Sequence, residues 1–368
     1  MRTYHFNTAS SPISRSAVSQ GPTVTVLIPA YNEEESIRDT LETLVLQTVP
    51  AERIIVVDDC STDRTAEFSS EYPVEVIRTP RNAGSKARAL NYVLPRCSTE
   101  LVMVVDGDAF LAPDYLEKML PVFEDPEVTL AAGCVLSKNV RTPAERGRSI
   151  ELLFSNHFYR PIQSRAGAPM VIPGCAAVYR MKDLRRRSGW TSPTVCEDID
   201  YTWVALLSGE KAVYVPDAVV WTIDPPTGPM LGRQVNRWMS SYFQSVRLHW
   251  KEAAHKPMLT LWVITCFLES AFSPFYWVSL VLLPLVWHIS WLITLWWWLG
   301  AQTALMLPPL VYGSIKRRIN PLRILASIPF LHYTRIFNSW YTIRAMVVEL
   351  VLVPLGISKG MTIFEKGH

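Results

Sequence analysis

The sequence predicts an α/β fold with a mostly parallel sheet, followed by a membrane domain. Three observations support this prediction. Short apolar segments alternate with helical segments over the first part of the chain, acidic side chains follow the ends of several apolar segments, and a long apolar stretch comes later. Alternation of strands and helices is typical of a parallel sheet that helices cover on both faces.

The expected elements can be taken in order. Four β-rich apolar segments are predicted strands: 23–29, 53–57, 74–78 and 101–105. Helical spacing or a helix-start signal marks the segments between them: 33–48, 61–70 and 83–94. Further along, we expect a helix at 141–160, a loop and strand at 170–180, a helix at 198–207, a strand at 213–220 and a helix at 232–250.

Composition and punctuation predict the domain organisation. Residues 1–22 are polar and Ser-rich, which indicates a disordered leader without a signal peptide. A His-Lys-Pro sequence at 255–257 marks the boundary between a catalytic domain, 23–255, and a membrane domain, 256–368. The formal net charge is only +3, so we expect no nucleic-acid partner. Six scattered cysteines without a CxxC pair argue against disulfides and a zinc site.

The stretch 258–315 contains a single charged residue, Glu269. A helix needs about 20 apolar residues to cross a bilayer, so the stretch has room for two transmembrane helices. Basic residues flank it on both sides, and the positive-inside rule then puts both ends in the cytoplasm. Interfacial or membrane helices are expected over 321–357. We therefore expect a multi-pass protein of the plasma or inner membrane that contacts lipid and has a cytoplasmic catalytic domain.

Acidic and polar side chains come directly after the predicted strands: Asn32, Asp58, Asp59, Asp106 and Asp108. Ligands bind beyond the carboxyl ends of the strands in open α/β sheets, which predicts one site there. The carboxylates of Asp106 and Asp108 are suitable ligands for Mg²⁺ or Mn²⁺ together with diphosphate oxygens. The alternative is a plain acidic turn, where Asp and Gly are favoured in any case.

Five segments in a fixed order carry a family resemblance: 29–34 (PAYNEE), 58–63 (DDCSTD), 106–108 (DGD), 197–198 (ED) and 234–238 (QVNRW). The chain resembles glycosyltransferase family 2, which has the GT-A fold, and in particular its membrane-bound hyaluronan, chitin and cellulose synthases. The resemblance covers residues 23–250. It implies a UDP-sugar donor and a glycan or lipid-linked acceptor.

The resemblance also implies roles for individual residues. The donor would contact Ala30, Tyr31, Glu33, Asp58, Asp59, Lys86, Asp106, Gly107, Gln234, Arg237 and Trp238. The acceptor sugar would lie against Gly174, Cys175 and Trp238, and the cation would bind Asp106 and Asp108. Asp198 would be the general base, Glu197 would orient it, and Arg237 would stabilise the phosphate charge. Simpler alternatives are a helix N-cap for Asp198 and a solvated helix position for Lys86.

These roles predict a metal-dependent, inverting glycosyltransferase, because one base and one displacement invert the anomeric centre. The first interpretation is a processive polysaccharide synthase, and the alternative is transfer of a single sugar to a lipid or glycan acceptor. A third interpretation is a scaffold that keeps the fold without catalysis. The hyaluronan synthases also carry N-terminal spans, which this sequence does not show, so a polymer channel would require a homo-oligomer.

Overall fold

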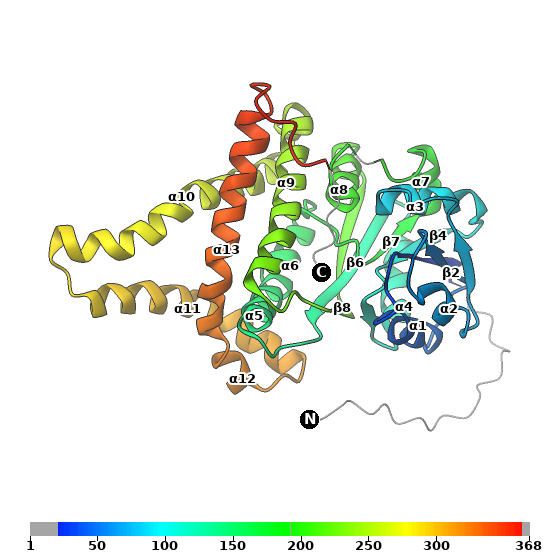
Figure 1. Cartoon of the computed structure of the whole chain (residues 1–368), viewed down its shortest axis with the longest axis horizontal. Helices are drawn as coiled ribbons and strands as arrows, with labels where there is room; N and C mark the ends of the chain where they lie inside the picture. Colours follow the sequence, from blue (N-terminus) through cyan, green and yellow to red (C-terminus); the bar gives the residue numbers. More distant parts are fainter. Residues whose placement is uncertain (1–20, 192, 363–368) are drawn as a thin grey trace.

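The computed structural model describes residues 21–191 and 193–362, so most of the predicted leader lies outside the described residues. One sheet holds eight strands in the order β3-β2-β1-β4-β7-β6-β8-β5 (Figure 1). The strands are β1 (Val24–Ala30), β2 (Arg53–Asp58), β3 (Glu75–Arg78), β4 (Leu101–Val105), β5 (Ala109–Leu111), β6 (Val128–Ser137), β7 (Ala176–Arg180) and β8 (Lys211–Thr222).

The helices divide between the sheet and a C-terminal group. Those that follow or cover the sheet are α1 (Ile37–Val45), α2 (Thr65–Ser69), α3 (Lys86–Val93), α4 (Tyr115–Met119), α5 (Pro143–His157), α6 (Tyr159–Arg165), α7 (Met181–Arg186), α8 (Glu197–Leu207) and α9 (Gly228–Ala253). The C-terminal group is α10 (Pro257–Trp287), α11 (Trp291–Lys316), α12 (Pro321–Leu325), α13 (Ile328–Val347) and a π-helical turn, η3 (Val348–Leu352).

The sheet is mixed, whereas the sequence predicts a mostly parallel one. Strand β1 is parallel to β2 and β4, β2 to β3, and β6 to β8, as the alternation of strands and helices predicts. Strand β7 is antiparallel to β4 and β6, and β5 is antiparallel to β8. Strand β5 has only three residues, too few for a periodic pattern, so sequence reasoning missed it.

Both faces of the sheet are buried. Along β1, Val26 and Ile28 belong to a core that also contains residues of α1 and α4, while Leu27 belongs to a second core with residues of α3 and α8. Alternate side chains of a strand point to opposite faces, so each face has its own helical cover. This double burial explains why the strands read as continuous apolar runs.

The C-terminal helices pack against the catalytic part through close backbone contacts. A Cβ on Gly147 of α5 would lie 2.3 Å from the backbone oxygen of Phe330 in α13, and one on Gly232 of α9 would lie 2.2 Å from the ring of Tyr341. Glycine therefore lets α13 lie directly against both α5 and α9. Helix α9 therefore lies between the sheet and α13 (Figure 1).

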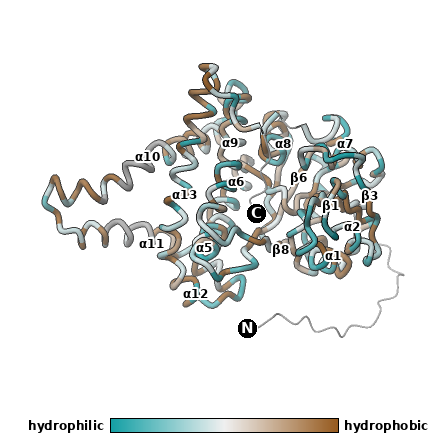
Figure 2. Tube along the Cα trace, in the orientation of Figure 1, coloured by the Kyte–Doolittle hydropathy of each residue, from teal (hydrophilic) through white to brown (hydrophobic). Residues whose placement is uncertain are grey.

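Helices α10 and α11 form a hairpin that projects away from the rest of the molecule (Figure 1), with apolar residues along it (Figure 2). Trp291, Leu292 and Trp296 near its tip are strongly exposed. Among the described residues, no helix combines the length and the apolar character that a membrane crossing requires. The two crossings predicted within 258–315 are therefore not confirmed.

Candidate active site

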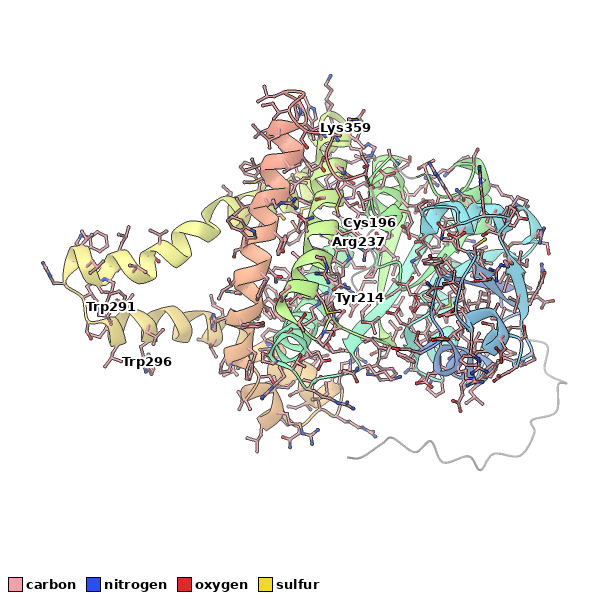
Figure 3. The ribbon with its side chains drawn as sticks, viewed as in Figure 1. Cys196, Tyr214, Arg237, Trp291, Trp296 and Lys359 are labelled. Atoms are coloured by element: carbon pink, nitrogen blue, oxygen red, sulfur yellow. The ribbon has the colours of Figure 1, made fainter. Side chains whose placement is uncertain are left out.

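The predicted site residues come from the ends of β1, β2 and β4, from the loop before α8, and from α9. Figure 3 places Cys196 next to Arg237 of α9, on the side of α9 that faces the sheet. The thiol of Cys196 lies 4.0 Å from the backbone oxygen of Arg237. The start of α8, which carries Glu197 and Asp198, therefore lies beside the helix that carries Gln234, Arg237 and Trp238. These segments are thus brought together although they are far apart in the sequence.

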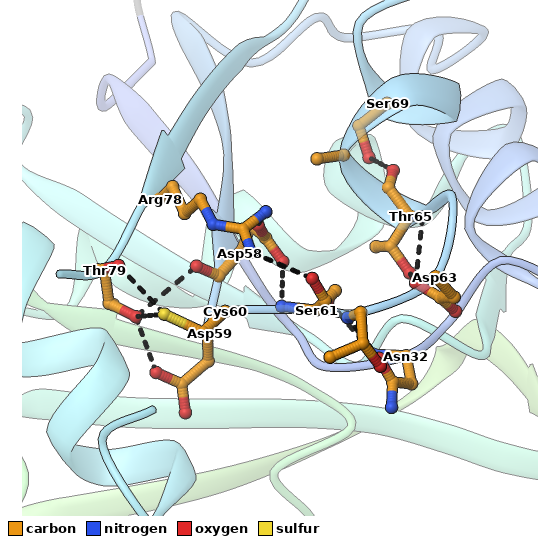
Figure 4. A network of polar contacts seen from close by, with 12 residues as sticks. Asn32, Asp58, Asp59, Cys60, Ser61, Asp63, Thr65, Ser69, Arg78 and Thr79 are labelled. Atoms are coloured by element: carbon orange, nitrogen blue, oxygen red, sulfur yellow. Dashed lines mark hydrogen bonds and ion pairs between the residues drawn. The ribbon is translucent and has the colours of Figure 1, made fainter. Parts of the chain in front are cut away.

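The loops after β1 and β2 are tied together by Asn32 (Figure 4). Its φ of 54° is in the left-handed region, which asparagine tolerates better than most residues. Its side-chain oxygen accepts a hydrogen bond from Thr62 N at 2.8 Å, and its backbone N–H donates to Ser61 Oγ at 3.1 Å. The loop with Tyr31, which is exposed, therefore has a fixed position beside the end of β2.

Asp58 and Asp59 both have partners within the protein (Figure 4). Asp58 is fully buried, accepts a hydrogen bond from Ser61 N at 3.0 Å and pairs with Arg78 at 2.9 Å. The carboxylate of Asp59 accepts hydrogen bonds from Thr79 Oγ1 and Ala83 N, both at 2.8 Å. Asp59 thereby holds the start of the loop that leads to Lys86.

Gly107 is required by a close approach from the first motif. A Cβ at this position would lie 2.8 Å from Cγ of Glu33, and the hydroxyl of Thr40 donates to the Gly107 oxygen at 2.8 Å. The side chain of Glu33 therefore lies directly against the Asp106–Asp108 turn. The structure thus joins Glu33 to this turn, although their sequence positions are far apart.

Lys86 lies at the centre of the charged groups. Its Nζ donates to Asp106 Oδ1 at 2.6 Å and to the Gly174 oxygen at 3.0 Å, and lies 3.4 Å from Glu197 Oε1. Burial by itself lowers the pKa of Lys86, but Asp106 and Glu197 outweigh it and raise that pKa well above its usual range. Lys86 is thus a charged link between the Asp106 turn and the base loop, not a solvated lysine.

Ser85 explains how Lys86 reaches this position. The backbone of Gly84 has φ of 75°, and the side chain of Ser85 caps α3 by accepting a hydrogen bond from Arg88 N at 3.3 Å. Ser85, between Gly84 and Lys86, therefore starts the helix. Lys86 then stands in its first turn and points at Asp106.

A cation would find two carboxylates here. The described residues contain no group of three or more His, Cys, Asp or Glu side chains arranged around a metal position. Lys86 engages Oδ1 of Asp106, which leaves Oδ2 and the carboxylate of Asp108 as the candidate ligands. This donor set fits Mg²⁺, which binds through one or two carboxylates and completes its shell with water and substrate phosphates.

Asp198 stands in the first turn of α8. Its Oδ2 accepts a hydrogen bond from Gly174 N at 2.9 Å and its Oδ1 accepts one from Ile199 N at 2.9 Å. Burial, followed by repulsion from Glu197, raises the pKa of Asp198 above its usual range, although the hydrogen bonds and Lys86 oppose the shift. A carboxylate with a raised pKa is a better proton acceptor, as a general base requires.

Gly174 and Cys175 form one wall of this arrangement. A Cβ on Gly174 would lie 3.2 Å from Cβ of Asp198 and 3.4 Å from Nζ of Lys86. The backbone oxygen of Cys175 accepts a hydrogen bond from Asp106 N at 3.0 Å. Burial raises the pKa of the Cys175 thiol to about 12, so the thiol is neutral at physiological pH. The predicted acceptor-side residues therefore adjoin both the base and the Asp106 turn.

Sequence reasoning missed a polar cluster beside Trp238. The guanidinium of Arg148 in α5 lies 4.8 Å from the centre of the Trp238 ring, and its Nε lies 3.7 Å from Oδ1 of Asp224. Burial raises the pKa of Asp224 to about 6. Asp224 follows β8 just before Pro225, and its place after a strand was the only available signal.

The three predicted site residues of α9 are similarly exposed. Gln234, Arg237 and Trp238 are all half-buried, and the side-chain oxygen of Gln234 is enclosed without a hydrogen-bond partner among the described residues. The roles assigned to these residues and to the other predicted ligands stay predictions.

Comparison with known proteins finds a family match over part of the chain. Residues 25–187 match Glycosyl transferase family 2. The chain is similar to the poly-β-1,6-N-acetyl-D-glucosamine synthase of Staphylococcus epidermidis, 28% identical over 245 residues, which are 64% of this chain and 59% of that protein. It is also 30% identical to an N-acetylglucosaminyltransferase of Mesorhizobium japonicum, over 62% of this chain and 57% of that protein.

The chain therefore spans less than two thirds of the length of these curated relatives. Solved structures support the GT-A glycosyltransferase fold. The mannosyltransferase PcManGT from Pyrobaculum calidifontis, in complex with GDP-Man and Mn²⁺, is similar with a TM-score of 0.55 and 21% identity, over 91% of this chain and 87% of that one. S. aureus TarS 1–349 in complex with UDP-GlcNAc is similar with a TM-score of 0.50 and 18% identity, over 94% and 99%.

Proposed function

We propose that this protein transfers N-acetylglucosamine from UDP-GlcNAc to a glycan acceptor, with inversion, in polysaccharide synthesis at a membrane surface. One observation carries the proposal: a single lysine, Lys86, joins the Asp106 turn to the loop of the candidate base, Asp198. The family 2 match supports the reaction class. The names of the two curated relatives support the choice of sugar.

The reaction follows from the positions of the charged groups. The acceptor hydroxyl oxygen forms a bond to the anomeric carbon, the bond from that carbon to the UDP oxygen breaks, and the hydroxyl proton passes to Asp198. A cation held by Asp106, Asp108 and the diphosphate would neutralise charge on the departing UDP. Lys86, which pairs with Asp106, would add positive charge beside that cation, and we assign the same task to Arg237. One displacement turns an α-linked donor into a β-linked product.

The test is a donor screen with purified protein. UDP-GlcNAc, UDP-glucose, UDP-glucuronic acid and GDP-mannose are offered with Mg²⁺ or Mn²⁺, and UDP or GDP release is measured together with product size. We expect turnover with UDP-GlcNAc and its loss in EDTA or in the Asp106→Asn, Asp108→Asn double variant. NMR of the product should show a β-linkage; an α-linkage, or full activity in EDTA, would contradict the mechanism.

Product size separates the two forms of the proposal. A ladder of polymers supports a processive synthase, and a single-addition product supports transfer of one sugar to a lipid or glycan acceptor. Isothermal titration calorimetry tests the third interpretation, a scaffold without catalysis. A scaffold would show no metal-dependent UDP binding.

Membrane contact is proposed for the α10–α11 hairpin, because its tip exposes large apolar side chains. Leu292 is 76% exposed and Trp296 is 80% exposed, and tryptophan favours the membrane–water interface. Co-sedimentation with vesicles of mixed zwitterionic and anionic phospholipid tests it. Leu292→Asp with Trp296→Asp should weaken binding, whereas Leu46→Asp, at an exposed apolar position in the catalytic part, should not. Equal binding by all variants would contradict the proposal.

A further inference from the structure

One buried side-chain amide connects the loop before the base to the C-terminal end of the described chain. Gln244 of α9 is 4% exposed. Its Oε1 accepts a hydrogen bond from Val195 N at 3.0 Å, and its Nε2 donates to Glu349 Oε1 and to the Met361 oxygen, both at 2.9 Å. The two ends of a single amide therefore hold two different segments.

The loop before the base is held by α9 at a second point. Cys196 N donates to Ser241 Oγ at 3.1 Å, one helical turn before Gln244, and the same hydroxyl lies 3.3 Å from the Cys196 oxygen. Cys196 is the residue directly before α8, which begins at Glu197 and has Asp198 in its first turn. The direction in which α8 starts, and with it the position of Asp198, thus depends on these bonds to α9.

The C-terminal segment is held by the same junction. Glu349 is fully buried in η3, and its Oε1 also accepts a hydrogen bond from Met361 N at 3.0 Å. Gly360 has φ of 72°, and a Cβ there would lie 2.9 Å from that same oxygen, so the segment packs closely on Glu349. Figure 1 shows the red segment turning back across α9, and Figure 3 places Lys359 at that end of the helix.

The chemistry of the amide makes the two attachments depend on one another. Its oxygen can face the Val195 N–H only if its NH₂ group faces Glu349 and Met361. If the C-terminal segment leaves, the NH₂ group loses the Met361 oxygen and keeps only Glu349 Oε1 as an acceptor. An amide that turns to find a second acceptor takes its oxygen away from the partly buried Val195 N–H, which is unfavourable.

We propose that Gln244 is a positioning residue through which the docked C-terminal segment, 358–362, holds the base Asp198 in its reactive place. The inference rests on the proposed function for its kinetic consequence. Its structural part, the coupling of residues 358–362 to residues 194–198, can be measured without turnover. The two parts therefore fail in distinguishable ways.

The sharpest variant is Gln244→Glu. A glutamate keeps an acceptor for Val195 N but turns a carboxylate oxygen toward Glu349 and the Met361 oxygen, so it should release the C-terminal segment selectively. Because displacement of a catalytic group by about 1 Å can cost about 100-fold, kcat should fall by at least about 10-fold in Gln244→Glu. The donor KM should stay within about two-fold.

A matched control exists at Gln47. Its Oε1 accepts from Leu116 N at 3.1 Å and its Nε2 donates to the Thr43 and Ala112 oxygens, the same pattern away from the base loop. Gln47→Glu should lower the melting temperature to a similar degree and leave kcat almost unchanged. A chain that ends after Ser358 should match the kcat of Gln244→Glu, and the combination should lose no more than either change alone.

Hydrogen exchange of a peptide over 194–200 supplies the readout that needs no activity. We expect faster exchange in Gln244→Glu and in the shortened chain, and the wild-type rate in Gln47→Glu. Unchanged exchange in Gln244→Glu and in the shortened chain overturns the inference. Absence of turnover in the wild type together with the expected exchange pattern would instead count against the proposed function.

Discussion

The two halves of the site treat their carboxylates differently. On the β2 side, Asp58 and Asp59 are satisfied by partners within the protein, among them Arg78, Thr79 and Ala83 (Figure 4). On the α8 side, the carboxylates of Glu197 and Asp198 are neighbours on a half-buried helix start, with Lys86 as the nearby cation. The carboxylates of the β2 side hold loops together, whereas those of the α8 side carry negative charge where burial makes it unfavourable.

This difference shows where chemistry is expected. Burial and Glu197 raise the pKa of Asp198, whereas the carboxylates of the β2 side bind neighbouring loops together. Perturbed pKa values gather at functional sites because a catalytic group must be tuned to its task. Variants that change one half of the site alone test this difference between the two halves.

The largest effect is expected for Asp198→Asn. The amide keeps an oxygen for the Gly174 N–H but cannot accept the acceptor proton, so kcat should fall by about 10²–10⁴-fold. UDP binding should be almost unchanged, because Asp198 is not among the residues that we assign to the donor. Turnover of UDP-GlcNAc and calorimetry with UDP measure the two quantities. Normal turnover in this variant would show that another group is the base.

The pH dependence of kcat should also identify Asp198 as the base. Turnover requires the unprotonated form of Asp198, so kcat should fall as pH drops through a pKa above the ordinary value of about 3.9. The stability effect has the opposite sign. The folded state binds this proton more tightly than the unfolded state, so the contribution of Asp198 to stability decreases as pH rises between the two pKa values. Above both values, Asp198→Asn should therefore have the higher melting temperature.

A smaller loss of kcat is expected for Lys86→Met. This substitution removes the positive charge that lies between the two halves of the site. Lys86 lowers the pKa of Asp198, so its loss should move the acid limb of the kcat profile to higher pH. Because Asp106 is partly exposed, its ion pair with Lys86 contributes less to stability than a fully buried pair would. We expect Lys86→Met to lower the free energy of unfolding by about 1–2 kcal/mol. Lys138→Met, at a surface ion pair with Asp39, is the control. If the acid limb does not move, Lys86 does not influence the pKa of the base.

Sequence reasoning predicted much of the parallel half of the sheet. Strands at 24–30, 53–58 and 101–105 were found because each is largely buried and reads as an apolar run. The strand at 75–78 was also found, although it lies at the edge of the sheet and exposes Glu75 and Arg78. The antiparallel half was harder to predict. The pairing of β7 with β4 and β6 joins segments separated by long helical insertions, and no local pattern specifies such a register.

The site was predicted where short motifs carry the chemistry, and it was missed where partners come from afar. Asp106, Glu197 and Lys86 could be named as site residues from their motifs, yet the contact between Lys86 and Glu197 depends on the packing of α3 and α8 against one face of the sheet. Arg148 and Gln244 had no signal, because a single arginine or glutamine in an amphipathic helix is usually a solvated position. Burial gives these residues their importance, and burial is a tertiary property.

The smallest effects are expected on the β2 side, where Asp58→Asn and Asp59→Asn should differ in kind. Asp58→Asn weakens the pair between the fully buried Asp58 and the exposed Arg78, so it should lower the free energy of unfolding by about 1–2 kcal/mol. Asp59→Asn keeps one acceptor oxygen for Thr79 and Ala83 but loses the charge that strengthens both bonds. The loop to Lys86 should loosen, which raises the donor KM by about two- to ten-fold and leaves kcat at saturation nearly unchanged. Urea unfolding and donor titrations separate the two variants. A fall in kcat as large as that of Asp198→Asn, in either variant, would mean that the β2 side takes part in the chemical step and that the division between the two halves is wrong.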